Sequence, residues 1–409
     1  MKFKGIKIEK WQQFDDVQIN FHERLTVLTG ANGSGKTTIL ALLAKHFGWN
    51  LHSLATPKRD KLTRTWKWIT GFLLPDINDG TGNAIGEITY SDNSKAKLIN
   101  PNQNSAQYQI EIQNQQAVEC FFIPSHRSVF RYQVLKSIPT EGTIDKRQAF
   151  QRVSDSTKHR YFGGDDQSSS FHMKETLVAW NIFGSGNRDM EADEKLLENF
   201  KGFEEILKVV LPIEIGFKKF IIRNFEVVLD CESGSFIIDA SSGGISAIID
   251  MAWQIYMYST DKRMEFTVLI DEIENHLHPT MQRKILSDFI KAFPNVHFIV
   301  STHSPLIVGS VRDSSVYVLR NNIENKVISQ HLDLVNEAKT ATEILDEVLG
   351  VSFTMPIWAE EKLKSIVKKY SKGEIQETTL KKMRSELAEI GLEKLLPEAV
   401  TNLIGENNA

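Results

Sequence analysis

The sequence predicts an α/β fold that carries an antiparallel β subdomain, a compact helical insert and a helical C-terminal tail. Three observations support this fold class. Apolar, β-branched residues at 25–29 run through a glycine-rich loop into an apolar segment of helical character at 39–47. Two later apolar runs, 266–270 and 296–300, end in polar side chains, which is typical of buried parallel strands. Residues 2–21 alternate between apolar and polar side chains, as antiparallel strands do.

The glycine-rich loop matches the phosphate-binding pattern G-x-x-x-x-G-K-[ST] at every fixed position. A strand that turns into a helix here presents backbone N–H groups and the positive end of the helix dipole to an anion. In this pattern the Lys36 ammonium reaches the β- and γ-phosphates, and the Thr37 hydroxyl binds Mg²⁺. The alternative is a chance glycine-rich turn. We predict a nucleoside triphosphate site formed by Gly30, Ala31, Asn32, Gly33, Ser34, Gly35, Lys36, Thr37 and Thr38.

Composition limits the function classes. The chain has 409 residues, 41% hydrophobic and 24% charged, which is ordinary for a soluble protein of one large two-lobed domain or a few smaller ones. Its formal net charge is −4, so any nucleic-acid binding must come from a local patch. Cys120 and Cys231 are the only cysteines and form no C-x-x-C pair, which argues against a disulfide framework. Without a signal-peptide core or an apolar membrane span, we expect a cytoplasmic protein with no membrane partner.

Two aromatic residues, Trp11 and Phe14, lie in a turn between the first two predicted strands. This order of strand, aromatic turn, strand and phosphate loop resembles the SMC and RecF group of ATPases. The resemblance implies that one of the two rings can stack on an adenine base. Relatives often carry an arginine in this turn, where this chain has Gln12 and Gln13. The alternative is that both aromatic rings pack against the sheet.

A basic and aromatic stretch follows at 56–68. Positive charge attracts phosphates and tryptophan rings offer stacking surfaces, so this stretch is the best local candidate for contact with DNA or a phage component. The alternative is a solvated basic edge whose tryptophans serve the core or a protein partner. The residues concerned are Lys58, Arg59, Lys61, Arg64, Trp66, Lys67 and Trp68.

The middle of the chain changes character after the predicted strand 119–123. In the ATPases that the chain resembles, a polar residue at the end of the first lobe touches the metal and the attacking water; Arg127 is a candidate for a phosphate or partner contact, and Gln133 is a weaker one. SMC-type proteins have a long coiled coil next, but no sustained heptads occur here, which favours a compact helical lobe. We predict an N-terminal lobe at 1–129, a helical insert at 130–212, a C-terminal ATPase lobe at 213–335 and a helical tail at 336–409.

A second glycine motif, Ser241-Ser242-Gly243-Gly244, precedes a predicted helix at 247–258. It resembles the Leu-Ser-Gly-Gly-Gln signature of ABC-type ATPases. The resemblance implies that Ser242, Gly243 and Gly244 cap the γ-phosphate of ATP held by another subunit, using a helix N-terminus as an anion site. The alternative is an ordinary helix-capping turn.

The apolar run 266–270 ends in Asp271 and Glu272. We expect Asp271 to hold Mg²⁺, largely through water, and Glu272 to polarise the water that attacks the γ-phosphate. The following residues 274–279 resemble the D-loop of compact ATPases of this group. Within them, His276 and His278 suggest either a metal site or a subunit interface, and the interface is favoured because no cysteine or third histidine accompanies them.

The apolar run 296–300 leads to Ser-Thr-His-Ser-Pro, in which His303 resembles the switch histidine that senses the γ-phosphate. A structural histidine at a strand end is the alternative. Farther along, Trp358 lies near Pro356 at a break between amphipathic helices, and no catalytic motif is recognised in the tail.

Together, the four motifs resemble compact RecF/SMC-like AAA-type ATPases, which include the ATPase half of OLD-family nucleases and the ATPase subunits of the anti-phage systems Septu and PARIS. The resemblance implies ATP and Mg²⁺ as cofactors and a homodimer or higher oligomer formed through the ATP sites. No Asp-x-Asp follows His303, so the TOPRIM nuclease of OLD proteins is not expected, and any effector belongs to a separate protein. The second hypothesis is a RecF-like DNA repair clamp. A transporter head is the third.

Overall fold

The computed structural model forms two compact units, Met1–Ala341 and Thr342–Ala409, and each is considered by itself. Among the residues it describes, no helix combines the length and the apolar character that crossing a membrane requires. The described residues are 1–59, 64, 66–69, 83–101, 105–127, 129–140, 145–164, 167–261, 263–332, 343–344, 357–370, 377–389, 391 and 393.

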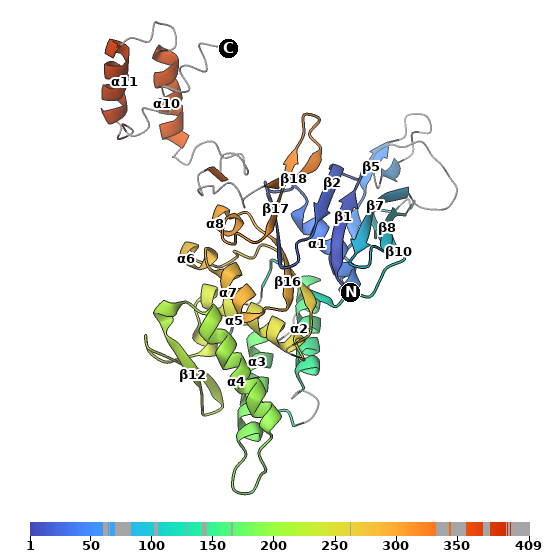
Figure 1. The fold of residues 1–409 in the computed structure, drawn as a ribbon, viewed down its shortest axis with the longest axis vertical. Coiled ribbons are helices and arrows are strands. Elements are labelled where there is room, and N and C mark those ends of the chain that lie inside the picture. The colour runs from blue at the N-terminus through green and yellow to red at the C-terminus, as the bar shows by residue number, and fades with distance from the viewer. Residues whose placement is uncertain are drawn as a thin grey trace. The chain divides into compact units, whose positions relative to one another are not determined.

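A mixed sheet forms the centre of the first unit (Figure 1). In spatial order, its described strands are β10 (Glu111–Gln113), β8 (Lys95–Asn100), β7 (Asn83–Tyr90), β1 (Phe3–Ile8), β2 (Phe14–Asn20), β18 (Val327–Leu332), β17 (Ser315–Asn321), β3 (Leu25–Gly30), β16 (Val296–Ser301), β15 (Phe266–Ile270) and β11 (Cys120–Ile123). The α/β fold class predicted from the sequence is confirmed.

The sheet has a parallel half and an antiparallel half. Strands β11, β15, β16, β3 and β17 pair in parallel, and every residue of β3 and β15 is buried, which explains their unbroken apolar runs. Strands β2, β1, β7, β8 and β10 pair in antiparallel fashion, with Ile6 opposite Ile19 on the buried face. Strand β18 joins the halves, since it pairs with β17 in antiparallel and with β2 in parallel fashion.

The parallel half determines where polar side chains meet. The carboxyl ends of parallel strands lie at one edge of a sheet, which is where ligands bind in open α/β folds. Helix α1 (Lys36–Ala44) starts at this edge after β3 and passes into a 3₁₀ turn, Lys45–Phe47, that ends at Gly48 with φ 72°. Strands β15 and β16 end at the same edge, with Asp271 and His303 just beyond them.

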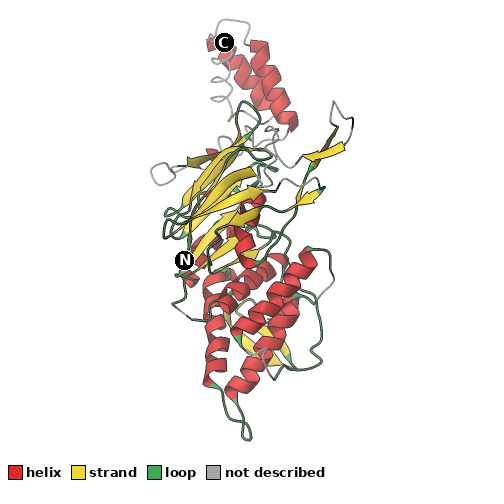
Figure 2. Ribbon diagram, turned by 90° about the vertical axis from the view of Figure 1, so that its right-hand side faces the viewer, coloured by secondary structure: helices red, strands yellow, loops and turns green. Residues whose placement is uncertain are grey.

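Three helices lie in the region predicted as a helical insert: α2 (Lys146–Tyr161), α3 (Ser169–Ser185) and α4 (Glu194–Val210). Each begins at a side-chain cap, provided by Asp145, Ser168 and Asp193 respectively, which satisfies backbone N–H groups of the first turn. They gather with α5 (Gly243–Tyr258) on one side of the sheet (Figure 2). Their core is aromatic, with Phe203 packed edge-on against Trp253 at 4.8 Å between ring centroids.

Short elements complete the first unit. The remaining strands are β4 (Ser53–Leu54), β9 (Gln107–Tyr108), β5 (Thr56–Arg59), β6 (Trp66–Ile69), β12 (Phe217–Arg223), β13 (Glu226–Cys231) and β14 (Phe236–Ile237). The other short elements are two 3₁₀ turns, Ile213–Ile215 and Ile238–Ala240, and the helices α6 (Pro279–Gln282), α7 (Ile285–Ala292) and α8 (Pro305–Val308).

The second unit contains two described helices, α10 (Ile357–Tyr370) and α11 (Glu377–Glu389). The apolar side chains Leu363, Val367 and Leu387 are buried. An ion pair of 2.5 Å between Lys369 and Glu386 links the two helices. Both helices lie within residues 336–409, which were predicted as a helical tail; Pro356 lies outside the described residues.

Candidate functional site

The phosphate loop requires glycine at two positions because the surrounding structure leaves no room for a side chain. Gly30 has φ 140°, and a Cβ there would lie 2.3 Å from the carbonyl oxygen of Leu319. Gly35 has φ 90°, and its Cβ would lie 2.3 Å from Cζ of Phe14. Both positions therefore combine a backbone conformation that favours glycine with a close neighbour. The antiparallel turn at Phe14 thus supports the loop directly.

Lys36 is almost fully buried beneath this loop. Its ammonium donates to the carbonyl oxygens of Gly30 at 2.9 Å and Ala31 at 3.0 Å. Burial lowers the pKa of Lys36 to about 8, and the nearby carboxylates of Asp271 and Glu272 oppose that shift. The ammonium therefore stays charged at neutral pH, positioned under the loop that a triphosphate would occupy.

The pKa of Lys36 gives a testable pH dependence. A bound triphosphate favours the ammonium, so nucleotide binding raises this pKa. Below about pH 8 the group is already charged and affinity should be flat; above it, binding must take up a proton, so affinity should fall by up to about tenfold per pH unit. Calorimetry in buffers of different ionisation enthalpy measures both the affinity and the proton uptake. Lys36→Arg, whose guanidinium stays charged, should show no slope in this range, and a flat profile for the native protein would contradict the assignment.

Thr37 and Asp271 meet although 234 positions separate them in the chain. The Thr37 hydroxyl lies 3.1 Å from Oδ1 and 3.0 Å from Oδ2 of Asp271. Asp271 is buried, and burial raises its pKa, while hydrogen bonds from Ser301 and Thr37 oppose the shift. The oxygens of a hydroxyl and a carboxylate are the donors that Mg²⁺ prefers, and this ion keeps waters and phosphates as its other ligands. The pair therefore fits Mg²⁺, and within the described residues no cluster of three or more His, Cys, Asp or Glu offers an all-protein cage instead.

Glu272 is held in an unusual backbone conformation beside this pair. Its φ is 45°, which is uncommon for a residue with a side chain and persists only where its surroundings impose it. The amide of Asn275 donates to Oε2 of Glu272 at 2.8 Å. The other carboxylate oxygen lies 3.7 Å from Nε2 of His303, and both side chains are about one-third exposed. The two residues predicted as base and switch thus lie side by side.

Ser301, which the sequence reasoning did not single out, connects the two carboxylate residues. Its hydroxyl donates to Oδ1 of Asp271 at 2.5 Å and accepts the backbone N–H of Glu272 at 2.8 Å. The backbone N–H of His303 donates to Oε1 of Glu274 at 2.5 Å. The sequence could have indicated Ser301, because it is the polar last residue of an apolar strand that ends at the same sheet edge.

The expectation that Arg127 contacts a phosphate or a partner is wrong. The buried guanidinium of Arg127 donates to the backbone carbonyl oxygens of Asp271 (3.1 Å), Glu272 (2.9 Å) and Asn275 (3.1 Å), so it supports the turn after β15 rather than a phosphate or partner. Burial lowers its pKa to about 10. Gln133 contacts Ser168 and Lys174 of the helical insert; its backbone oxygen accepts from the Lys174 ammonium at 2.5 Å.

The rings of Trp11 and Phe14 are also accounted for by packing. Both are 1% exposed, and they stack on each other with centroids 5.9 Å apart. The indole N–H of Trp11 donates to the hydroxyl of Tyr108 at 3.2 Å. The packing alternative is therefore confirmed, and the expectation that one of the two rings stacks on an adenine base is wrong.

The glycine signature begins helix α5, four residues earlier than the sequence suggested. Ser242 is the exposed N-cap residue, and its hydroxyl makes no capping hydrogen bond. A Cβ on Gly244 would lie 3.0 Å from the carbonyl oxygen of His276, so the signature packs tightly against the turn after β15. Among the described residues, no hydrogen bond joins Ser242 to the phosphate loop. The helix N-terminus thus keeps an exposed hydroxyl.

A buried ion cluster anchors the segment just before this signature. Lys174 on α3 is fully buried and pairs with Asp239, which lies three residues before Ser242, and with Glu226 at 3.2 Å. Breaking a buried pair of this kind costs about 3–5 kcal/mol because it leaves an uncompensated charge. The helical insert is therefore tied to the signature by charge as well as by packing.

The paired histidines lie in and after the turn that follows β15. His276 is exposed with φ 69°, and His278 caps α6 by accepting the N–H of Thr280. Neither belongs to a metal-ligand cluster within the described part of the chain. The metal alternative therefore receives no support from the geometry.

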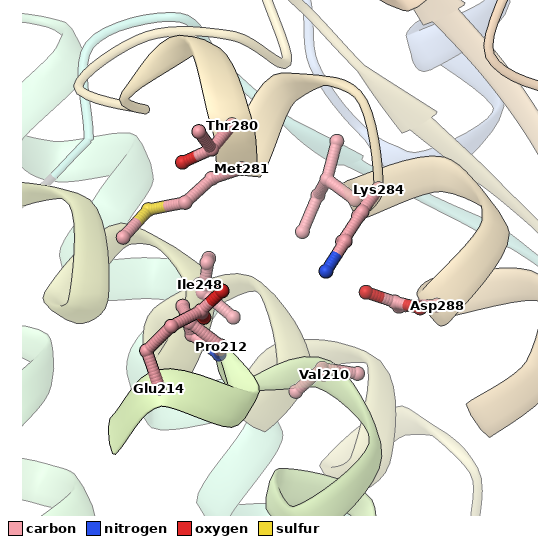
Figure 3. Close-up of a pocket in the computed structure, with 9 residues that line it drawn as sticks. Val210, Pro212, Glu214, Ile248, Thr280, Met281, Lys284 and Asp288 are labelled. Atoms are coloured by element: carbon pink, nitrogen blue, oxygen red, sulfur yellow. The ribbon is translucent and has the colours of Figure 1, made fainter.

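A small pocket near α6 and α7 does not coincide with this site. Figure 3 shows Met281, Ile248 and Lys284 around it, with Asp288 on the side of Lys284. None of the phosphate-loop residues lines it, nor do Asp271 and Glu272. The hydrogen-bonded polar groups of Thr37, Asp271 and Ser301 lie at the sheet edge, so the sheet edge is the candidate site.

The basic and aromatic stretch forms the hairpin β5–β6, in which Arg59 lies opposite Trp66. Trp66 is 66% exposed, so it does not serve mainly the core, and Trp68 is 38% exposed. Lys61 and the side chain of Lys67 lie outside the described residues.

Comparisons with known proteins agree with the motifs. Residues 5–238 match a family model described as an AAA domain, and residues 252–309 match a second AAA-domain model whose description also names the AbiEii toxin and a type IV toxin–antitoxin system. These matches cover the phosphate loop in the first case and Asp271, Glu272 and His303 in the second. The resemblance to AAA-type ATPases stated from the motifs is confirmed.

The relatives include two Septu proteins named PtuA. The one from Bacillus thuringiensis is 24% identical over 380 residues, which cover 87% of this chain and 86% of the relative. The one from Bacillus mycoides (strain KBAB4) is 35% identical over 120 residues, covering 28% of this chain and 17% of the relative. A retron Vc95 probable ATPase from Vibrio cholerae serotype O1 biovar El Tor is 33% identical over 104 residues, covering 25% of this chain and 20% of the relative.

Solved structures that match include the SMC head domain from Thermotoga maritima, with a TM-score of 0.40 and 12% identity over 81% of this chain and 98% of that chain. An SMC head domain with an extended coiled coil from Pyrococcus furiosus, bound to the C-terminal domain of ScpA, matches with a TM-score of 0.41 and 14% identity over 85% of this chain and 99% of that chain.

Proposed function

Because this chain belongs to the AAA-domain family, we propose that it binds ATP with Mg²⁺ and hydrolyses ATP to ADP and phosphate. The observation that carries the proposal is the hydrogen-bonded group formed by Thr37, Asp271, Ser301 and Glu272 at the end of the parallel strands. These are the residue types that phosphoryl transfer requires, at the sheet edge where the phosphate loop turns into α1.

The chain's own residues divide the work. The loop N–H groups and the Lys36 ammonium hold and orient the phosphates. Thr37 and Asp271 would hold Mg²⁺, which would supply positive charge to offset the negative charge of the phosphates. Glu272 accepts a proton from the attacking water, and His303, within 3.7 Å of Glu272, is placed to respond to the γ-phosphate. Arg127 fixes the backbone that aims Glu272, so it acts as a positioning residue.

We propose further that the ATP site is completed by a second subunit. Ser242 is exposed at the start of α5 and leaves its hydroxyl and the adjoining N–H groups available to an anion. A γ-phosphate held by another copy of this chain fits such a site. ATP then links subunits, and hydrolysis separates them, in a homodimer or a higher oligomer.

The output we propose is control of a separately encoded effector in an anti-phage defence system. The similarity to two Septu PtuA proteins, one along most of its length, and to a retron ATPase supports this role. The second unit offers a docking position: Trp358, 60% exposed on α10, presents a large apolar side chain to solvent. A DNA-repair clamp of the RecF kind is the alternative function.

We expect Trp358→Ala to release the effector while ATP hydrolysis continues, because the variant removes an exposed docking side chain and leaves the ATP site intact. The measurement is co-purification of the neighbouring gene product with the tagged chain in ATP and in ADP, alongside phosphate release. Trp66→Ala, which removes a second exposed tryptophan from the other unit, is the matched control. Retention of the effector by Trp358→Ala would move the docking site elsewhere, and a duplex-DNA affinity that rises with ATP and no effector at all would favour the clamp.

A further inference from the structure

The β5–β6 hairpin concentrates positive charge in an acidic protein. Residues 56–69 contain five basic residues against one acidic residue, a formal charge of +4, whereas the whole chain carries −4. Lys58, Arg59 and Arg64 are exposed and form no ion pair with any residue that the structure describes. The hairpin projects beyond the antiparallel half of the sheet, away from α2–α5 (Figures 1 and 2). Such a protrusion attracts polyanions without help from the rest of the molecule.

Strand register separates the two faces of this hairpin. Pro57 lies opposite Trp68, and Arg59 lies opposite Trp66, whereas Lys58 lies opposite Lys67. Because residues in register share a face and successive residues alternate, one face carries both tryptophans with Arg59, and Lys58 lies on the other face. The Nε of Arg59 donates to the backbone oxygen of Arg64 at 3.2 Å, which anchors its guanidinium at that face.

We propose that this face binds single-stranded nucleic acid, with Trp66 and Trp68 stacking on bases and Arg59 contacting the phosphate chain. Bases in a duplex are already covered by their neighbours, whereas a single strand exposes both faces of each base to an aromatic ring. A polyanion matches the hairpin's formal charge of +4 better than an uncharged protein surface does. The site is separate from the ATP site and does not depend on ATP hydrolysis.

The test measures binding of fluorescently labelled (dT)20 and (rU)20 to the full chain by anisotropy, without nucleotide, across a salt series. We expect Trp66→Ala to weaken binding by about tenfold with the salt slope unchanged, and Trp66→Phe to restore most of it. Arg59→Ala should reduce the slope of log K against log salt by about 0.7, as expected when one phosphate contact is lost, whereas Lys58→Ala on the opposite face should change it less. Trp358→Ala, an equally exposed tryptophan in the other unit, should bind like the native chain.

An abasic deoxyribose-phosphate oligomer of the same length separates stacking from charge alone. The proposal requires the abasic oligomer to bind more weakly than (dT)20, and its affinity to be the same for Trp66→Ala as for the native protein. The proposal would be overturned if the abasic oligomer bound as tightly as (dT)20, or if Trp66→Ala bound (dT)20 as tightly as the native protein. It would also be overturned if Trp66→Ala lost a protein partner but still bound the oligonucleotide. A preference for (dT)20 or (rU)20 supports the proposal and identifies DNA or RNA as the ligand. The Lys36→Ala variant should bind as the native chain does, so failure of the ATP site and failure of this site remain distinguishable.

Discussion

Glu272→Gln should bind ATP with native affinity and lose ATP hydrolysis by a factor of about 10²–10⁴. The substitution keeps the shape of the side chain and leaves an amide oxygen to accept from Asn275, which now donates to Oε2 at 2.8 Å. It removes only the charge and the site that takes a proton from water. Lys36→Ala should instead abolish binding in the productive pose, because no other buried cation lies under the loop carbonyls of Gly30 and Ala31 in the described structure.

The measurements are nucleotide affinity by calorimetry and single-turnover phosphate release. The matched control is Glu265→Gln, which makes the same change at an exposed carboxylate before the other end of β15, where Glu265 pairs with Lys2 at 3.0 Å. That variant should hydrolyse ATP normally. Normal turnover in Glu272→Gln would contradict the assignment of Glu272 as the base. It would favour Glu274, whose Oε1 accepts the backbone N–H of His303.

The hydrogen bonds of Arg127 could not be predicted from the sequence. Motif residues were predictable because the chemistry of phosphate binding requires particular side chains at fixed spacing, as in the loop that ends in Lys36 and Thr37. The partners of Arg127 are backbone carbonyl oxygens about 145 positions away, and every residue has such an oxygen. No pattern of side chains in the sequence indicates these acceptors, so an arginine after a strand end is easily predicted to contact a ligand.

The same reasoning applies to the aromatic turn. Trp11 and Phe14 were consistent with base stacking or packing, and only the tertiary approach of Phe14 to Gly35 decides between these alternatives. The sequence likewise could not predict that β18 joins the two halves of the sheet, because its pairing with β2 connects residues more than 300 positions apart. Burial of Lys174 against Asp239 could have been suspected only from their charges.

Mixing two inactive variants should restore ATP hydrolysis if subunits share the site. Lys36→Ala destroys the phosphate loop and leaves the signature intact, while Ser242→Arg places a bulky cation on the exposed start of α5 and leaves the loop intact. In a two-fold dimer of one copy of each, one composite site joins the intact loop to the intact signature. Each mixed dimer has one working site of two, so turnover should reach about one half of native in purified mixed dimers and about one quarter in a random mixture of equal amounts, in which half of all dimers are mixed.

The experiment co-expresses the variants with different tags and purifies mixed dimers through both tags, so that slow subunit exchange cannot hide rescue. Ser105→Arg, the same change at an exposed serine just before β9, should keep native turnover alone and when mixed with native chains. In sedimentation, Glu272→Gln with ATP should form a larger species than the nucleotide-free protein. The double variant Glu272→Gln/Ser242→Arg should not form this larger species with ATP. Absence of rescue in the doubly purified dimer means that Ser242 does not reach a neighbour's phosphate. The hydroxyl at the start of α5 would then be an ordinary helix cap, and each chain would complete its ATP site alone.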